Sequence, residues 1–537
     1  KLGLAPDAPE RLEAGILYAL QQLSNEGHVF YPRMPLLAKA RELLAVEPDL
    51  LEAALQRLAF RQELVLAANL DPHAGSDPDQ QAVYLAGFYL AETRAAARLR
   101  HLLHGQRRLP LTDAEQALVW VQKVLSLSLA PQQAQAIRMS LQHPVLIITG
   151  GPGTGKTTII KAILKIWGKL GRSALLAAPT GRAAKRMAEV TGHEARTIHR
   201  LLEYSHQKGG FQVSERRTLD CDLLIIDEAS MIDILLLHHL LKGVPQGATL
   251  ILVGDAHQLP SVGPGQIFHD LIASGVIPVI ELTEIFRQAK DSLIVVNAHR
   301  INQGLLPHRR PEPGHREDFY FLEQEDPEEV QRLILELVRD RIPRRFGFDP
   351  LEEIQVLTPM HRGPVGVVQL NQQLQQVLNP GQPGLERHGQ RFQVGDKVMQ
   401  LRNNYDKEVF NGDIGRITHL DLEMQELEVT FDGRPVLYDF TELDELTLAY
   451  AISVHKAQGS EYPAVVLPVV TQHYLLLQRN LIYTAVTRGK QLVILVGSKK
   501  ALTLGVKNDK TRHRYSQLRY FLQGGAESMV SQAFIGG

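Results

Sequence analysis

Cysteine is nearly absent from this sequence: Cys221 is the only one among 537 residues. A single cysteine excludes an intramolecular disulfide and a metal site built from a cysteine cluster, and it favours a reducing, cytoplasmic compartment. The sequence also lacks an apolar run of about eighteen residues and a basic segment followed by an apolar one, which argues against a membrane span and a secretory signal. We therefore expect no membrane partner.

An excess of charge is missing too, because the formal net charge is −1. The whole chain therefore lacks the basic footprint of a polyanion-binding protein, although acidic surfaces elsewhere can cancel one local basic channel. Hydrophobic residues make up 44% and charged residues 22%, as in globular proteins, and the length predicts about three or four domains. The sequence starts at Lys1 rather than methionine, so we expect a truncated or processed product that lacks an N-terminal region.

Residues 1–105 form the first predicted domain, which is mainly helical. Leu51, Leu55 and Leu58 recur at helical spacing behind a plausible cap at Asp49. A short strand follows, which is compatible with a winged-helix-like module or with a helical scaffold packed on the rest of the chain. The predicted helices are Pro9–Asn25, Met34–Leu44, Asp49–Arg61 and Gln80–Leu103.

From about residue 125, short apolar runs alternate with amphipathic helical segments. Such runs, each followed by Gly, Pro or Asp and then a helix, are typical of parallel strands buried on both faces. Two successive sets predict an α/β fold with two doubly wound sheet domains, at 106–280 and at 281–389 with 447–537. Residues 390–446 alternate in polarity instead, which predicts a small inserted β-barrel. The apolar runs are VLIIT (145–149), ALLAA (174–178), DLLIID (222–227), LILVG (250–254), IQVLT (354–358), VVLPVV (465–470) and LVILVG (492–497).

The strongest motif is an apolar strand that leads into Gly150-x-x-x-x-Gly155-Lys156-Thr157 and then a helix. Glycines let successive backbone N–H groups point at phosphate oxygens, and the helix N-terminus adds its dipole. Lys156 can reach the β- and γ-phosphates of ATP, and the Thr157 hydroxyl can ligate Mg²⁺. The predicted nucleotide-binding residues are Gly151, Pro152, Gly153, Thr154, Gly155, Lys156, Thr157 and Thr158.

Two further segments predict the rest of a hydrolytic site. In DLLIIDEAS, Asp227 would hold Mg²⁺ together with Thr157, and Glu228 would polarise the attacking water. In the Gly-Asp-x-x-Gln-Leu-Pro arrangement after another buried strand, Gln258 is placed to sense a γ-phosphate. With Lys156, these residues form the predicted catalytic set.

With these motifs the chain resembles superfamily 1 helicases, most closely their RecD-like branch, over roughly residues 125–500. The resemblance implies two RecA-like sheet domains with ATP in the cleft between them. Further segments in the family's order carry it: LAPQQAQAI (129–137), AAPTGRAAKRM (177–187), ARTIHRLL (195–202), ELTEIFRQ (281–288), VLTPMHRG (356–363), YAISVHKAQGSEY (450–462) and YTAVTRGK (483–490).

The resemblance also implies roles for individual residues. Gln133 would read the adenine, Arg287 would sense phosphate, and Arg488 would act as an arginine finger from the second domain. Gly459 and Glu461 complete the implied nucleotide contacts. The implied contacts to a single strand are Pro179, Thr180, Thr197, His199, His361, Arg362, Ser453 and His455. For Thr180 and His199, a role as a helix cap or as a satisfied core group is an equal alternative.

The function implied is that of a monomeric DNA helicase that uses ATP and Mg²⁺, moves 5′→3′ on single-stranded DNA and acts at junctions with duplex DNA. A superfamily 1 RNA helicase or remodeller and a nucleotide-gated clamp on single strands are the alternatives. Residues 476–520 contain ten Lys or Arg residues against one acid, which favours either a basic channel or a solvated basic face.

Residues 203–219 contain two alternating segments around Lys208-Gly209-Gly210, a favourable hairpin turn. In RecD-like enzymes a hairpin at this place separates the strands. Deletion of residues 205–214 should therefore abolish duplex unwinding while DNA-stimulated ATP hydrolysis survives. Unwinding and ATPase assays on the same variant test this, and loss of both activities would mark the hairpin as structural.

Overall fold

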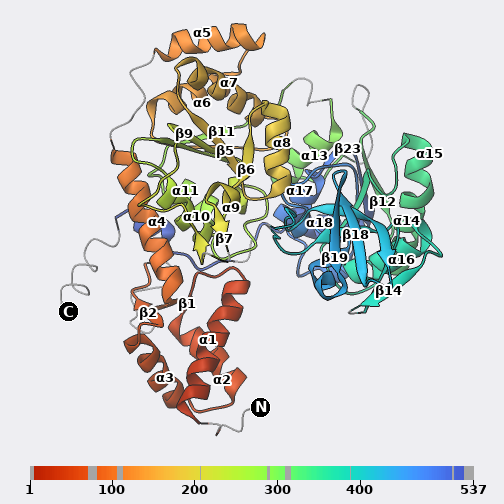
Figure 1. The fold of residues 1–537 in the computed structure, drawn as a ribbon, viewed down its shortest axis with the longest axis horizontal. Helices are drawn as coiled ribbons and strands as arrows, with labels where there is room; N and C mark the ends of the chain where they lie inside the picture. The colour runs from red at the N-terminus through yellow and green to blue at the C-terminus, as the bar shows by residue number, and fades with distance from the viewer. Residues whose placement is uncertain are drawn as a thin grey trace.

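The computed structural model describes the chain in several stretches, which together form an N-terminal domain, two parallel-sheet domains and a small antiparallel sheet (Figure 1). Arg287 lies outside the described residues, so its predicted phosphate contact stays a prediction. No helix in the described part of the chain is long and apolar enough to cross a bilayer. The described residues are 5, 7–70, 81–105, 113–205, 207, 209–286, 291–308, 316–387, 389–404, 406–510 and 513–524.

The N-terminal domain combines three helices with an antiparallel sheet of order β1-β3-β2. The order helix, strand, two helices, two strands is that of a winged helix. Leu51, Leu55 and Leu58, spaced for a helix in the sequence, are fully buried in its core. The elements are α1 (Pro9–Asn25), β1 (Phe30–Pro32), α2 (Arg33–Leu44), α3 (Pro48–Phe60), β2 (Leu64–Ala67) and β3 (Ala82–Leu85).

The predicted helix Gln80–Leu103 is wrong at its start. Ala82–Leu85 form strand β3, which pairs with both β1 and β2 and so lies at the centre of the sheet. Its Val83 and Tyr84 are completely buried, and this central pairing outweighs the helical tendency of the flanking sequence. Helix α4 (Ala86–His104) begins directly afterwards and carries the chain to the first motor domain.

The first motor domain is a parallel six-stranded sheet of order β11-β4-β10-β9-β5-β6. Successive residues of Val145–Gly150, the strand β4, point to opposite faces of the sheet. Leu146 and Ile148 pack with α7 on one face, whereas Val145 and Ile147 lie on the face covered by α4 and α10 (Figure 1). β11 pairs with β4, so this sheet extends across the predicted domain boundary at residue 281. Its strands are β4 (Val145–Gly150), β5 (Ala174–Ala178), β6 (Ala195–Thr197), β9 (Leu223–Ile226), β10 (Thr249–Gly254) and β11 (Val279–Leu282), and its helices are α5 (Ala114–Leu125), α6 (Pro131–Gln142), α7 (Lys156–Lys169), α8 (Gly181–Thr191), α9 (Ile198–Leu201), α10 (Ile234–Gly243) and α11 (Ile267–Ala273).

The second motor domain has a parallel five-stranded sheet of order β12-β23-β22-β13-β21. Between α16 and β21 the chain forms the hairpin β14-β15 and an antiparallel sheet of order β19-β18-β17-β16-β20. These strands run from Gly384 to Leu448, so they start before the insertion predicted at 390–446 and end just after it. The expected fold class is confirmed. The strands are β12 (Phe319–Glu323), β13 (Ile354–Thr358), β14 (Gly384–Arg387), β15 (Gln390–Gln393), β16 (Lys397–Gln400), β17 (Ile414–Asp421), β18 (Glu426–Phe431), β19 (Arg434–Asp439), β20 (Leu446–Leu448), β21 (Ala451–Ser453), β22 (Tyr462–Val469) and β23 (Gly489–Gly497), and the main helices are α13 (Leu293–Asn302), α14 (Pro327–Glu336), α15 (Ile342–Phe346), α16 (Val367–Leu378), α17 (Arg479–Val486) and α18 (Lys499–Lys507).

A short hairpin projects from the first motor domain after α9. Strands β7 (Tyr204–Ser205) and β8 (Gly210–Phe211) pair antiparallel, as the glycine turn predicts. Lys208 lies outside the described residues. The Phe211 ring lies 4.9 Å from Tyr204 and 4.5 Å from His239 of α10, so aromatic contacts fix the base of the hairpin on the domain.

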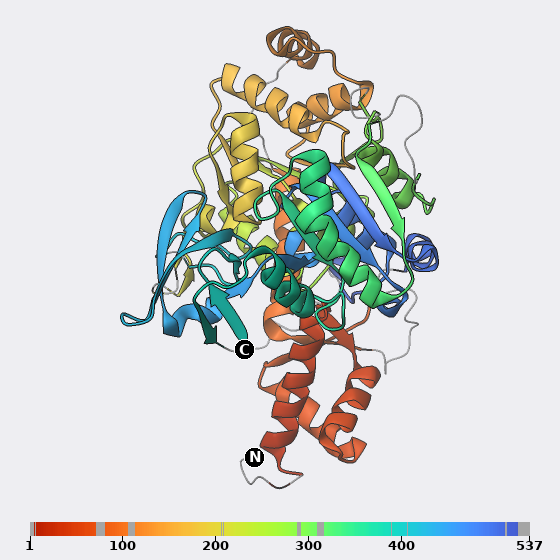
Figure 2. The ribbon, with the colours of Figure 1, turned by 90° about the vertical axis from the view of Figure 1, so that its right-hand side faces the viewer.

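The C-terminal segment returns to the first motor domain. The predicted boundaries place residues 513–524 in the second domain, but α19 (Leu518–Leu522) packs against α4 and α11 because its apolar side chains are buried there. Figure 2 shows the molecule from the side of the second motor domain, with the N-terminal helices in red below both motor domains. Arg514 donates hydrogen bonds to the carbonyls of Ser261, Gly263 and Gly265, at 2.8, 3.2 and 2.8 Å. This segment, the C-terminal strap, therefore holds the loop that follows Gln258.

A buried carboxylate joins the strap to α4. Glu92 is 0% exposed and accepts hydrogen bonds from the hydroxyls of Tyr84 and Ser516, at 3.0 and 2.6 Å. It also accepts the backbone N–H groups of Gln517 and Leu518. Burial raises the pKa of Glu92 to about 7, although these hydrogen bonds oppose the shift.

Because folding raises the pKa of Glu92, the folded chain binds this proton more tightly than the unfolded chain. The free energy of unfolding should therefore fall as pH rises from about 4.5 to about 7, by roughly 1–3 kcal/mol. Glu92→Gln should remove that part of the pH dependence, whereas Glu42→Gln, at an exposed position of α2, should not. Thermal unfolding across this pH range tests it, and an unchanged profile for Glu92→Gln would contradict the assignment.

Candidate nucleotide site and strand contacts

The phosphate loop lies between β4 and α7. Gly153 and Gly155 have φ angles of +73° and +83°, which L side chains rarely adopt. A Cβ at Gly155 would also lie 2.3 Å from the Gln133 amide nitrogen. The Lys156 ammonium group donates to the carbonyls of Gly150 and Gly151, at 2.6 and 3.0 Å, and so stays folded over the loop. The loop thus has the conformation in which its N–H groups can surround phosphate oxygens.

Gln133 lies against the back of this loop. Its amide nitrogen donates to the Thr154 carbonyl at 3.2 Å, and its amide oxygen accepts the Ala130 N–H at 3.1 Å. The side chain is almost completely buried. In this structure Gln133 therefore supports the loop and α6, and its contact with adenine stays a prediction.

The two acidic residues follow β9. Asp227 accepts the Glu228 N–H at 2.9 Å, and Glu228 has a φ angle of +50°, which turns the chain sharply at the strand end. Burial and the charge of Glu228 raise the pKa of Asp227, while Lys156 and Arg186 oppose the shift. A half-buried carboxylate with the Thr157 hydroxyl at the start of α7 fits a hard cation such as Mg²⁺.

Gln258 is buried beside the cleft. Its amide nitrogen lies 3.4 Å from an Asp255 carboxylate oxygen, and its amide oxygen has no hydrogen-bond partner among the described residues. The next residue is held by the second motor domain: the Leu259 N–H donates to the Thr484 hydroxyl at 2.9 Å, and its carbonyl accepts from the Gln458 amide at 2.8 Å. The orphaned oxygen can accept a hydrogen bond from a water molecule.

The second motor domain also contacts the phosphate loop. The Tyr483 hydroxyl donates to Asp255 at 2.7 Å, and it would lie 3.0 Å from a Cβ placed at Gly151. His299 of α13 lies 3.2 Å from the Pro152 carbonyl. Sequence reasoning missed these residues: Tyr483 and Asp255 stand within quoted motifs, whereas His299 carries no sequence signal.

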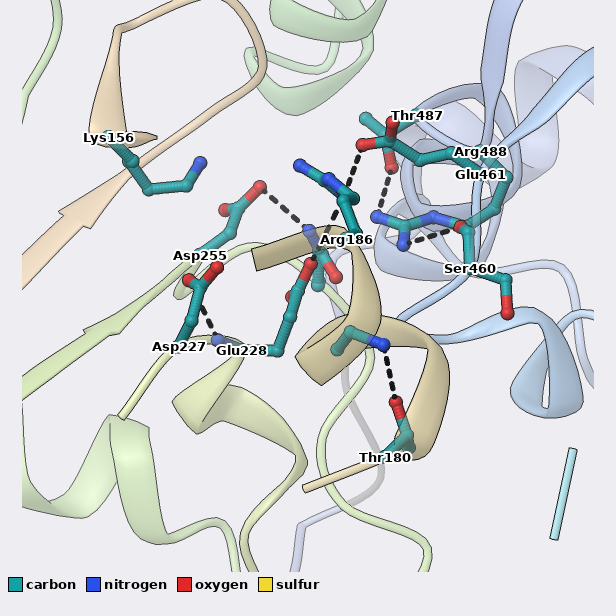
Figure 3. A network of polar contacts seen from close by, with 12 residues as sticks. Lys156, Thr180, Arg186, Asp227, Glu228, Asp255, Ser460, Glu461, Thr487 and Arg488 are labelled. Atoms are coloured by element: carbon teal, nitrogen blue, oxygen red, sulfur yellow. Dashed lines mark hydrogen bonds and ion pairs between the residues drawn. The ribbon is translucent and has the colours of Figure 1, made fainter. Parts of the chain in front are cut away.

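Arg488 lies across the cleft from Lys156 (Figure 3). It is 2% exposed and donates to the carbonyls of Thr484 and Ser460 and to the Thr487 hydroxyl, at 3.1–3.2 Å. All three partners belong to its own domain. To act as an arginine finger, this guanidinium must exchange these contacts for the nucleotide.

Gly459 and Glu461 face α8 rather than the phosphate loop. A Cβ at Gly459 would lie 2.6 Å from the Thr180 hydroxyl, so the two domains meet closely here. Glu461 forms an ion pair with Arg186 of α8 (Figure 3) and another with Lys490, at 3.4 Å. In this arrangement both residues join the two motor domains.

Several implied strand contacts have structural roles. Thr180 and Thr197 cap α8 and α9, where their hydroxyls accept the N–H groups of Ala183 and Arg200. The His199 ring lies 5.5 Å from Phe211 of the hairpin, and burial lowers its pKa. In this structure Thr180 acts as a helix cap, His199 is half-buried against the hairpin, and Pro179 is partly exposed just before α8. The contacts of these residues with a strand stay predictions.

The implied contacts from the second domain line two different cavities. His361 and Ser453 line a cavity of about 550 Å³ beside α16 and β15, and Arg362 is exposed nearby. His455 lines a cavity of about 720 Å³ together with Gln258 and Arg514. Of the basic residues after 476, Arg488 and Arg514 bind backbone carbonyls, whereas Lys499, Lys500, Lys507 and Lys510 are exposed as in a solvated basic face.

Most of the chain is similar in sequence to known proteins. Family models match residues 133–264 as an AAA domain, 370–431 as the SH3 domain of ATP-dependent RecD-like DNA helicases and 448–496 as a UvrD-like helicase C-terminal domain. The ATP-dependent RecD2 DNA helicase of Deinococcus radiodurans is 36% identical over 93% of this chain and 67% of its own length. The RecBCD enzyme subunit RecD of Mycobacterium tuberculosis is 29% identical over 83% of this chain and 81% of its own. A Bacteroides Pif1 helicase, solved with ADP-AlF3 and ssDNA, is 20% identical with a TM-score of 0.42, over 69% of this chain and 92% of that one.

Lys156→Ala should reduce ATP turnover by on the order of a hundredfold or more, because the loop loses the cation that faces the phosphates. Binding to single-stranded DNA should remain close to that of the parent chain. Lys165→Ala, exposed further along α7, is the matched control and should retain turnover. Steady-state hydrolysis and strand-binding titrations measure both, and persistent turnover in Lys156→Ala would show that the site is misassigned.

Proposed function

Because the chain belongs to the RecD-like DNA helicases of superfamily 1 and is an ATP-dependent DNA helicase, we propose that it hydrolyses ATP between its two motor domains and moves 5′→3′ along single-stranded DNA. One observation supports the site of hydrolysis above all: the Tyr483 hydroxyl of the second domain bonds to Asp255 and lies against Gly151 of the phosphate loop. The loop of one domain is thus covered by the other.

The residues around the loop suit in-line attack of water on the γ-phosphate. Lys156 would leave the carbonyls of Gly150 and Gly151 for the phosphate oxygens, which are stronger acceptors. Thr157 and Asp227 would hold Mg²⁺, which when bound supplies positive charge to the phosphates and the leaving group. Glu228 would take up the proton of the attacking water, and the free oxygen of Gln258 would orient that water.

Hydrolysis would be coupled to motion through the segment at Gln258. Leu259 is held at its N–H and its carbonyl by Thr484 and Gln458 of the second domain. Loss of the γ-phosphate changes the surroundings of Gln258, and the adjacent backbone passes this change to the second domain. Arg488 would complete the cycle by contacting the transition-state charge when the cleft closes.

We propose that the chain acts as a monomer in the cytoplasm. Both walls of the nucleotide cleft belong to one chain, so no partner is needed to complete the site. The single, buried Cys221 is compatible with a reducing compartment. The two alternatives, an RNA remodeller and a passive clamp, are not favoured by the relatives, which are named as an ATP-dependent RecD2 DNA helicase and as the RecBCD enzyme subunit RecD.

Unwinding of duplexes with a single 5′ or 3′ DNA overhang tests direction and substrate together. We expect ATP-dependent unwinding from the 5′ overhang and little from the 3′ overhang or a blunt end. Lys156→Ala is the control for unwinding without hydrolysis, and an RNA overhang of the same sequence is the control for the strand. Efficient unwinding from the 3′ overhang would contradict the proposed direction, and equal use of RNA would contradict the proposed substrate.

A further inference from the structure

Arg186 joins the catalytic carboxylates of one motor domain to the other domain. It lies on α8, and its guanidinium forms an ion pair with Glu461 of the second domain and lies 3.9 Å from Glu228 of the first (Figure 3). About a third of its side chain is exposed, and Glu228 is only 12% exposed. The same guanidinium therefore contacts both the proposed general base, Glu228, and the opposite wall of the cleft.

Negative charge exceeds positive charge around Arg186, because one guanidinium lies near three carboxylates. Burial alone would lower its pKa, but the carboxylates of Glu461, Glu228 and Asp227 together raise it. Glu461 also pairs with a second cation, Lys490, at 3.4 Å, whereas Arg186 is the cation within ion-pair distance of Glu228 in the described part of the chain. A neighbouring guanidinium attracts a carboxylate and so restricts its orientation. While this contact persists, the Glu228 carboxylate is directed at Arg186 and is not free to turn toward the attacking water.

α8 also reaches the region of the implied strand contacts. Thr180 caps its first turn and lies against Gly459 of the second domain. Arg182, four residues before Arg186 and on the same face, donates to the hydroxyls of Ser460 and Tyr462 at 3.3 and 3.2 Å. From the first turn to Arg186 the helix rises only about 8 Å. A rigid helix of this length transmits a displacement at its start to the side chain of Arg186.

We propose that Arg186 is a positioning residue that restrains Glu228 in the absence of nucleic acid and releases it when a bound strand shifts α8. In the strand-free chain, Arg186 is held between Glu461 and Glu228. When a strand engages the start of α8, the guanidinium moves with the helix away from Glu228, and the carboxylate is then free to turn toward the attacking water. This inference rests on the proposed function and adds to it the means by which DNA stimulates hydrolysis.

The test compares ATP turnover of Arg186→Ala with and without a single-stranded thymidine oligonucleotide. We expect the DNA-free kcat to rise about three- to fivefold, the effect of removing a partly exposed ion pair, with KM for ATP unchanged. The DNA-stimulated kcat should stay within about twofold of the parent chain. The ratio of the DNA-stimulated kcat to the DNA-free kcat should therefore fall by about the same factor as the DNA-free kcat rises.

Two further variants exclude a merely structural effect. Arg182→Ala removes an interdomain contact from the same helix but leaves the partner of Glu228, so its DNA-free kcat should match the parent chain. Arg186→Lys keeps the charge without the planar guanidinium that can face two carboxylates, and it should give an intermediate DNA-free kcat. If Arg186→Ala unfolds at a lower temperature than the parent, Arg186→Lys decides the question.

The proposal is overturned if the DNA-free kcat of Arg186→Ala is unchanged, or if both rates fall together. A rise in KM alone would show that Arg186 binds the nucleotide, and an equal rise in Arg182→Ala would show a general loosening of the domain contact. A parent chain that neither unwinds DNA nor responds to it would refute the proposed function itself. A parent that does both, beside an Arg186→Ala variant with unaltered stimulation, would refute only the role of Arg186.

Discussion

The arrangement of the nucleotide site depends on contacts that cross the cleft between the two motor domains. Tyr483 reaches Asp255, and Leu259 is bound through both of its backbone polar groups by Thr484 and Gln458. These are short hydrogen bonds at buried positions, where an unpaired partner is costly. Opening of the cleft must therefore replace each of them by water or nucleotide. The cleft should therefore have discrete closed and open conformations instead of a continuous range of opening angles.

The parts of this site that are formed by neighbouring residues in the sequence could be predicted, because the residue types of one short segment determine their conformation and chemistry. The phosphate loop needs glycine at Gly153 and Gly155, where φ is positive, and Asp227 stands directly after a buried apolar strand. The contacts that join the domains could not be predicted in this way. Arg186 and Tyr483 stand inside quoted motifs, but their partners lie hundreds of residues away and are defined only by the tertiary structure.

The same distinction between local and long-range contacts explains where the predicted fold differs from the structure. Strand β3 was predicted as helix because its four residues carry weak local signals, whereas its pairing with two strands is decided by the assembled sheet. The strap was assigned by continuity of sequence, but its apolar residues are buried against α4. Among the implied strand contacts, Thr180 and Thr197 satisfy helix N-termini, a role that their residue type favours in any protein.

The return of the strap has a mechanical consequence. The chain crosses between the motor domains after β11 and crosses back after α18, where Arg514 binds the carbonyls of Ser261, Gly263 and Gly265. Two bodies attached at two separate points rotate most easily about the line through those points, and sliding or twisting strains one attachment. The strap thus favours a two-point hinge, whose axis is set by covalent connections while the nucleotide determines only the angle.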